Sequence, residues 1–131
     1  MTTSSVIPMS DEWALSLRHL VKYPDCNATK NLFGGLMLAW IDEGAAMFAA
    51  TLMRTDRLVT AHMDGIDFKV PVPKGSVCSV FCKMRKRGRT SLTVDVLVTT
   101  SRFSAPDVEL EVARTTLVFV ALDENNSPTE W

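Results

Sequence analysis

The sequence predicts an α+β fold in which an antiparallel sheet wraps around one long helix. Two observations carry this prediction. The apolar run from Leu36 to Met53 has the length and composition of a buried core helix. The chain after this run consists almost entirely of β-rich stretches separated by turn residues. One apolar helix followed by antiparallel strands packs as a helix against a sheet.

Length and charge place the chain among folded single domains. It has 131 residues, of which 47% are hydrophobic, with 14 Lys+Arg against 15 Asp+Glu and a formal net charge of −1. This composition excludes intrinsic disorder, and the length suits one domain over residues 1–131. We expect an ordered core from about residue 13 to residue 123, with polar tails at both ends. The near-neutral charge argues against nucleic acid as a partner.

The chain before the helix is predicted to form one strand and one polar loop. Residues 13–21 (WALSLRHLV) show the loose alternation of an opening strand. The stretch YPDCNATKN that follows is rich in turn-forming residues. Gly34 and Gly35 then precede the helix, where they allow another group to approach the backbone closely.

The helix itself resembles a membrane span in its length. Its only charges are Asp42 and Glu43. Two adjacent carboxylates at the centre of a spanning helix are costly in lipid, so we expect the core helix of a soluble protein and no membrane partner.

Four strands are predicted after the helix. The first covers residues 57–70, with a bulge or kink at Gly65. Residues 77–85 and 91–100 are joined by a hairpin at KRGRT, and a turn at residues 104–107 leads into the last strand over residues 108–122. The tail DENNSPTEW is expected to be loose. So small a sheet has open edges, which dimerisation by edge pairing would close.

The three cysteines and the first ten residues indicate a reducing compartment. Cys26, Cys78 and Cys82 lack the spacing of a zinc site, and on one strand the last two lie about 13 Å apart. We therefore expect free thiols and no metal. The opening MTTSSVIPMS lacks the charge and apolar run of a secretory signal, so a cytoplasmic location is predicted.

The helix carries the residues most suited to catalysis. A carboxylate in an apolar helix is unfavourable unless it is paired or used, and adjacent residues point about 100° apart, so at most one of Asp42 and Glu43 faces a given pocket. Simple solvation of both is an equal alternative on physical grounds alone. The unpaired amides at Gly34 and Gly35 can polarise a carbonyl oxygen, although a glycine pair also serves close packing.

The stretch DCNATKNLFGGLMLAWIDEGAA resembles the signature of hotdog-fold acyl-CoA thioesterases. The similar branch contains the bacterial YciA-type enzymes and the cytosolic brain-type acyl-CoA hydrolases. The matching residues are Asp25, Asn27, Asn31, Leu32, Phe33, Gly34, Gly35 and Asp42. Further matches are RLVT at residues 57–60, DGIDFKVPVPKG and RGRTSLTVDV, so the resemblance covers about residues 13–123.

The resemblance implies a fold, a reaction and a catalytic pair. It implies an obligate dimer, or a hexamer as in similar proteins, that hydrolyses acyl-CoA without metal or cofactor. Asp42 and Asn27 fall on the positions of the family's catalytic pair. Asp42 is expected to act as general base or as nucleophile, Asn27 to hold the water or thioester, and the Gly35 amide to polarise the thioester carbonyl.

A basic run supplies the expected coenzyme A site. Five of the seven residues in KMRKRGR, from Lys83 to Arg89, are basic. Arginine engages phosphate bidentately, although a basic hairpin tip is more often merely solvated. The resemblance places coenzyme A contacts in this region, and the residues expected to bind substrate are Gly34, Arg57, Thr60, Arg87, Gly88, Arg89, Thr90 and Ser91.

Helix geometry predicts that two chains share each active site. Seven residues at 1.5 Å rise separate Gly35 from Asp42 by about 10 Å, yet both must lie within about 3 Å of one thioester. Two antiparallel helices related by a two-fold axis can meet this requirement.

Two other functions compete with hydrolysis. A non-catalytic acyl-CoA sensor has no need of Asp42. A hydroxyacyl-CoA dehydratase favours a histidine base, but His19 and His62 both lie outside the signature.

Overall fold

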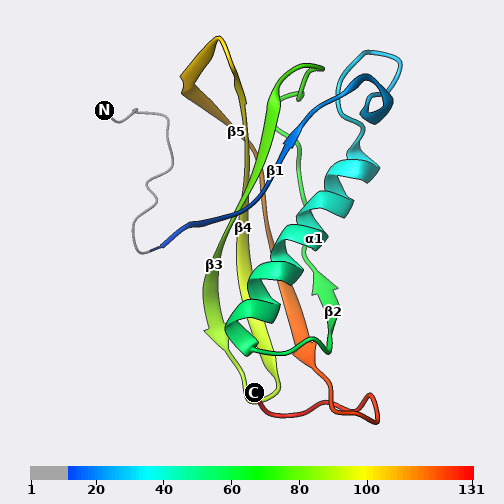
Figure 1. The fold of residues 1–131 in the computed structure, drawn as a ribbon, viewed down its shortest axis with the longest axis vertical. Helices are drawn as coiled ribbons and strands as arrows, with labels where there is room; N and C mark the ends of the chain where they lie inside the picture. Colours follow the sequence, from blue (N-terminus) through cyan, green and yellow to red (C-terminus); the bar gives the residue numbers. More distant parts are fainter. Residues whose placement is uncertain (1–11) are drawn as a thin grey trace.

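A single long helix lies along one face of a curled five-stranded antiparallel sheet in the computed structural model, which describes residues 12–131 (Figure 1). The helix is α1 (Gly34–Met53), and a short 3-10 helix, η1 (Tyr23–Asp25), precedes it. The strands are β1 (Ala14–Leu20), β2 (Leu58–Met63), β3 (Val77–Arg87), β4 (Ser91–Arg102) and β5 (Ala105–Ala121). This architecture confirms the predicted fold class.

The sheet has the strand order β1-β3-β4-β5-β2, and every neighbouring pair is antiparallel. The two strands next to the helix in the sequence, β1 and β2, therefore form the two edges of the sheet. The long strands β3, β4 and β5 form its centre and supply most of the buried apolar side chains. Both edges lack a partner within the part of the chain that the structure describes.

The helix packs on the sheet along one stripe. The side chains of Met37, Ile41, Ala45 and Ala49 recur every four residues and are all buried. Two large apolar side chains of α1, Met47 and Leu52, are 44% and 43% exposed. By length and composition α1 is apolar enough to cross a membrane. Since its buried stripe is covered by the sheet, α1 is the core helix of a folded soluble domain.

The boundaries of two strands differ from prediction. β2 ends at Met63 instead of continuing to Val70, and its register shift lies between Thr60 and His62 instead of at Gly65. Past the end of β2 only scattered bonds reach β5, including the Lys69 amide to the Val112 carbonyl at 2.7 Å. β5 begins at Ala105, so it includes most of the predicted turn at residues 104–107.

The C-terminal tail is ordered, contrary to the prediction of a loose end. After β5 the chain turns at Asp123, whose carboxylate accepts the amides of Asn125 and Ser127 at 2.8 and 3.0 Å. It then runs back along the strand, where the Thr129 amide donates to the Ala121 carbonyl at 2.9 Å. Trp131 anchors it by donating its indole N–H to the Ser91 carbonyl at 2.9 Å. Residues 122–131 thus form an ordered C-terminal return, in which polar side chains and main-chain groups satisfy one another's hydrogen bonds.

We expect Gly44→Ala to lower the free energy of unfolding by about 1 kcal/mol. A Cβ on Gly44 would lie 3.0 Å from Val80 Cγ1 and 3.3 Å from the Cβ atoms of Leu17 and Val80. The main chain fixes these two Cβ atoms, so side-chain rotation cannot move them away. The helix propensity gained with alanine does not offset this crowding. Urea unfolding measures the change.

Gly65→Ala is the matched control, because a Cβ there would meet no atom within 4 Å. We expect this substitution to be neutral or to stabilise by less than about 1 kcal/mol. Equal losses in both variants would contradict close packing at Gly44.

Candidate active site

Asp42 lies in the middle of α1 with its side chain half-buried and held by a neighbouring strand. The Thr60 hydroxyl of β2 donates a hydrogen bond of 2.7 Å to Asp42 Oδ1. The adjacent Glu43 is exposed, so the two carboxylates face different surroundings as their 100° separation requires. Asp42 is therefore oriented by a specific contact, while Glu43 is solvated. Thr60, expected to contact substrate, has this carboxylate as its hydrogen-bond partner.

Asn27 organises the loop between η1 and α1. Its side-chain oxygen accepts the Thr29 amide at 3.0 Å, the Thr29 hydroxyl at 2.6 Å and the Asn31 amide at 3.3 Å. The loop is joined to the strand entry by the amide of Leu32, which donates to the Val72 carbonyl at 2.8 Å. These three bonds engage only the side-chain oxygen of Asn27. They fix the side chain, and its amide nitrogen is available to another group.

Lys30 closes the loop that carries Asn27 in a conformation unusual for its residue type. Its φ is +63°, in the left-handed region that glycine adopts most easily. The Lys30 amide donates to the Asn27 carbonyl at 2.9 Å, which closes the turn. The loop is therefore held with some backbone strain at Lys30.

The entry of α1 combines free amides with two aromatic rings. Within the described residues, the Gly34 and Gly35 amides have no recorded hydrogen-bond acceptor, and Phe33 at the N-cap contributes no side-chain cap. A Cβ on Gly35 would lie 3.1 Å from the ring of Phe33, and one on Gly34 would lie 3.2 Å from the ring of Phe68. A side chain at either glycine would require the neighbouring ring to shift by a few tenths of an ångström. Both phenylalanines are 45% exposed, so they border an open apolar surface.

One chain does not bring Asn27, Gly35 and Asp42 together. Asn27 and Gly35 lie at the N-terminal end of α1, whereas Asp42 lies two turns further along it (Figure 1). The rise of the helix places about 10 Å between Gly35 and Asp42, as expected from the sequence.

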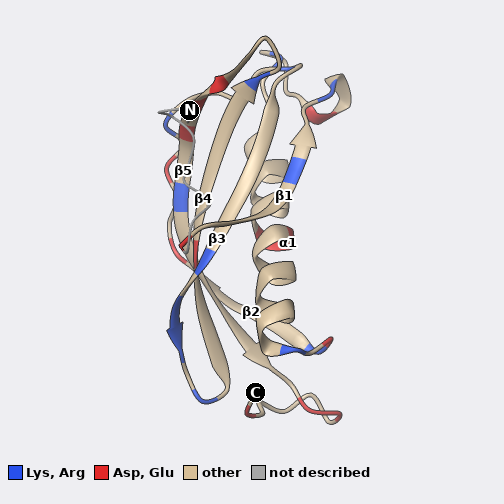
Figure 2. Cartoon of the chain, turned by 60° about the vertical axis from the view of Figure 1, so that its left-hand side comes forward, with Lys and Arg blue, Asp and Glu red and all other residues tan. Residues whose placement is uncertain are grey.

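The arginines expected to bind coenzyme A gather at the other end of the molecule. Figure 2 shows the basic β3–β4 turn and the acidic residues of the C-terminal return at this same end. Arg57 donates from Nε to the Asp123 carbonyl at 3.0 Å and from Nη2 to Asn126 Oδ1 at 2.5 Å. Arg87 stacks on the ring of Trp131, and Arg89 lies 3.7 Å from the Glu130 carboxylate.

The remaining predicted residues form the turn itself. The Gly88 amide donates to the Ser91 carbonyl at 2.9 Å, and a Cβ on Gly88 would lie 2.3 Å from the Ser91 hydroxyl. Only glycine fits there. The Thr90 carbonyl accepts the amide of Ala121, which joins the turn to the end of β5 at 2.9 Å.

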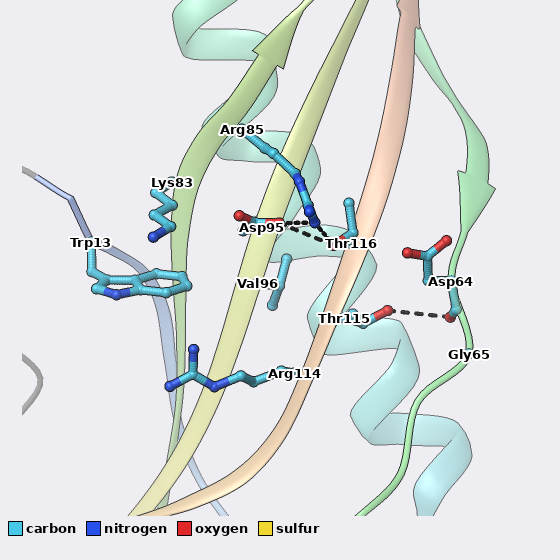
Figure 3. Close-up of a pocket in the computed structure, with 10 residues that line it drawn as sticks. All are labelled: Trp13, Asp64, Gly65, Lys83, Arg85, Asp95, Val96, Arg114, Thr115 and Thr116. Carbon is cyan, nitrogen blue, oxygen red and sulfur yellow. Dashed lines mark hydrogen bonds and ion pairs between the residues drawn. The ribbon is translucent and has the colours of Figure 1, made fainter.

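A hollow of about 360 Å³ lies on the face of the sheet opposite the helix (Figure 3). Trp13 lies in it between Lys83, 4.7 Å from the ring centre, and Arg114, at 5.8 Å. Arg85 pairs with Asp95 at 3.3 Å, and Arg114 pairs with Glu111 at 3.0 Å. Because its charges compensate one another and none of the predicted site residues lines it, we assign this hollow no catalytic role.

The histidines lie away from the Asp42 site. The ring of His19 stacks on Trp40 with centroids 4.3 Å apart, and His62 lies 2.7 Å from Asp64. Among residues 12–131, no three His, Cys, Asp or Glu side chains gather as metal ligands. Cys78 and Cys82 are buried, and all three cysteines are unpaired thiols.

One long helix enclosed by a curled five-stranded antiparallel sheet is the architecture of the hotdog fold. Residues 29–102 match the family model of the Thioesterase superfamily. The chain belongs to this superfamily.

Individual relatives extend the match over almost the whole chain. The acyl-CoA thioester hydrolase YciA of Salmonella typhimurium is 28% identical over 130 residues, 98% of this chain and 95% of the relative. The hexameric thioesterase of Yersinia pestis superposes with a TM-score of 0.83 at 29% identity, covering 89% of this chain and 93% of that one. The acyl-CoA hydrolase of Staphylococcus aureus, solved with butyryl coenzyme A and coenzyme A, has a TM-score of 0.81 at 29% identity, covering 93% and 73%.

Three features of the site escaped the sequence analysis. These are the hydrogen bond from Thr60 to Asp42, the ring of Phe68 over the helix entry, and Trp131 against Arg87. Each joins residues that are far apart in the chain. Of these, only the contact with Trp131 had a sequence signal, a tryptophan in an otherwise polar tail.

Burial gives the two strand cysteines a measurable effect on stability. It raises the pKa of Cys78 and Cys82 from 9.0 to about 12. Above pH 9 the thiols of the unfolded chain lose protons that the native thiols keep. Stability is therefore lost as pH rises from 9 to 12, at about 1.4 kcal/mol per pH unit per thiol. Urea unfolding across this range, compared with Cys78→Ala and Cys82→Ala, should show that each substitution removes about half of this slope. Parallel curves for all three proteins would contradict the prediction.

Proposed function

We propose that this protein hydrolyses acyl-CoA thioesters to a free carboxylic acid and coenzyme A. The observation that carries the proposal is the half-buried Asp42, held by Thr60 and placed seven residues after a glycine pair with unpaired amides. Membership of the Thioesterase superfamily gives the bond that is broken, and the names of the acyl-CoA hydrolases that it resembles give the substrate class.

Asp42 supplies the base. One of its oxygens accepts the Thr60 hydroxyl, so the other is left to take a proton from water. The water oxygen forms a bond to the thioester carbon, and the carbon–sulfur bond then breaks. The sulfur leaves as the coenzyme A thiol after taking up the proton held by Asp42. Direct attack by Asp42 to form a mixed anhydride is the alternative that the same position allows.

The Gly35 amide and Asn27 act on the other side of the carbonyl. An unpaired amide at a helix N-terminus, with the positive end of the helix dipole behind it, stabilises the negative oxygen of a tetrahedral intermediate. Asn27 has a fixed side-chain oxygen and a free amide group that can hold the water or the thioester. The rings of Phe33 and Phe68 border this position.

Each site takes Asn27 and Gly35 from one chain and Asp42 from its partner. The single chain leaves apolar side chains of α1 half-exposed on two sides, at Met47 and at Leu52, so a two-fold related helix has apolar surface to cover. The edge strand β2, where Val59 is 45% exposed, contacts α1 through Thr60 and has no outer partner within residues 12–131. We propose a dimer for this reason, and a hexamer of three dimers by similarity to the Yersinia pestis thioesterase.

Coenzyme A binds at the basic turn. Arg57, Arg87 and Arg89, with the main chain and hydroxyls of Thr90 and Ser91, gather at one end of the sheet. Arginine guanidinium groups pair with phosphates through two parallel hydrogen bonds. The proposed reaction uses water and side chains alone, without metal or redox cofactor, and we place it in the cytoplasm, where free thiols persist.

The competing functions fit the site less well. A sensor has no use for a carboxylate oriented by a hydroxyl. A dehydratase base would be expected near the glycine pair, whereas His19 is stacked on Trp40 and His62 is paired with Asp64.

Asp42→Asn is expected to lower kcat by about 10²- to 10⁴-fold while acyl-CoA binding remains. Loss of thioester absorbance is the appropriate readout, because the protein's own thiols react with thiol reagents. Glu43→Gln removes the adjacent, solvated carboxylate and should keep wild-type kcat. If Asp42→Asn retains full activity, or if wild type binds acyl-CoA without hydrolysing any chain length, the proposed function is wrong.

Mixing two inactive variants tests the shared site. Asp42→Asn and Asn27→Ala chains, unfolded together and refolded in equal amounts, form mixed dimers in half of the cases, and each mixed dimer has one intact site. We expect recovery of about a quarter of wild-type activity. Variants refolded separately and then combined provide the control. No recovery in stable mixed dimers would place all catalytic groups of a site in one chain.

A further inference from the structure

The C-terminal return (Leu122–Trp131) covers the basic turn that the proposed function assigns to coenzyme A. Its path is fixed at three points: the bridge between Leu122 and Pro128, the Thr129 amide on Ala121, and the Trp131 indole N–H on the Ser91 carbonyl. The turn and the return are thus one structural unit, although 40 residues separate Ser91 from Trp131.

Within this unit Arg87 is held from one flat side. Its guanidinium carbon lies 3.8 Å from the centre of the Trp131 ring, and one of its N–H groups donates to the main-chain oxygen of Trp131. A guanidinium has five N–H donors in one plane. Stacking on the flat face therefore holds the group in place while the remaining donors in its plane stay available for a phosphate.

The contact made by Arg89 is of a different kind. It lies 3.7 Å from Glu130, with the two side chains 80% and 72% exposed, so the pair is loose and easily exchanged for a ligand phosphate. A hollow of about 350 Å³ adjoins this pair, lined by Arg89, Thr90 and residues 128–130. An open, charged space thus lies against Arg89, two residues along the turn from the fixed Arg87.

We infer that Trp131 is a positioning residue for the nucleotide part of coenzyme A, which it serves by holding the Arg87 guanidinium ready for a phosphate. The inference rests on the proposed function for its ligand. An arginine fixed in advance loses less conformational freedom on binding than a free one. Trp131 does not touch the thioester, so its effect is confined to substrate binding and to substrates that carry the nucleotide.

The test compares two substrates with the same acyl group, butyryl-CoA and butyryl-pantetheine, the second of which lacks the nucleotide. We expect Trp131→Ala to raise KM for butyryl-CoA about two- to fivefold with kcat unchanged, and to leave both constants for butyryl-pantetheine unchanged. Trp131→Phe retains an aromatic face and should restore most of the affinity. In an Arg87→Ala background, Trp131→Ala should have no further effect on KM.

Calorimetric binding of free coenzyme A separates this inference from the proposed function. Wild type that binds coenzyme A but hydrolyses no thioester would refute the hydrolase, and a weaker affinity in Trp131→Ala would still support the positioning role. A lower KM or tighter binding in Trp131→Ala would overturn the inference, because the return would then compete with the nucleotide. Equal KM increases for both substrates, or no change in either, would also overturn it. Thermal unfolding verifies that each variant is folded.

Discussion

The packing of α1 on its sheet is the constraint on which the rest of the structure depends. The sheet covers one stripe of the helix so closely that a Cβ on Gly44 would lie 3.0 Å from Val80 Cγ1. Met47 and Leu52 of the helix remain half-exposed, and the edge strand β2 has no partner on its outer side within residues 12–131. The sheet covers α1 on one side, so the remaining apolar surface of the helix needs a second partner. A second copy of the same chain offers an apolar surface of the same composition.

The same constraint divides the catalytic groups. A rigid helix fixes the distance between the Gly35 amide and the Asp42 carboxylate at about 10 Å, and no movement within one chain can shorten it. In the proposed mechanism the carbonyl-polarising Gly35 amide and the general base Asp42 thus lie on one helix. The proposed dimer places the N-terminus of one helix beside the middle of the other. In the proposed dimer, oligomerisation and catalysis therefore depend on the same helix, α1.

The opposite end of the molecule shows how a long-range contact organises a charged surface. Three arginines of the expected coenzyme A site have their polar groups engaged by the C-terminal return. The oxygens that bind Arg57 and the indole ring that stacks on Arg87 are uncharged, so these contacts leave charge and free donors on both arginines, whereas Arg89 is loosely paired with Glu130. The return thereby connects the strand that ends at Ala121 with the turn that begins at Arg87.

The sequence by itself determined the elements whose signals are local. The length and composition of α1, the glycine pair at its entry and the hairpin at Gly88 all follow from periodicity and spacing within short windows. The choice of Asp42 over Glu43 as the catalytic carboxylate rests on spacing and resemblance and stays a prediction. The tertiary structure alone decided the early end of β2 at Met63, the partner of Asp42 and the order of the C-terminal return. These depend largely on contacts between residues far apart in the chain, such as Thr60 with Asp42, 18 positions away, and Trp131 with Arg87, 44 positions away. Local periodicity carries no record of such contacts, because they form only when the curled sheet brings distant strands, the helix and the chain end together.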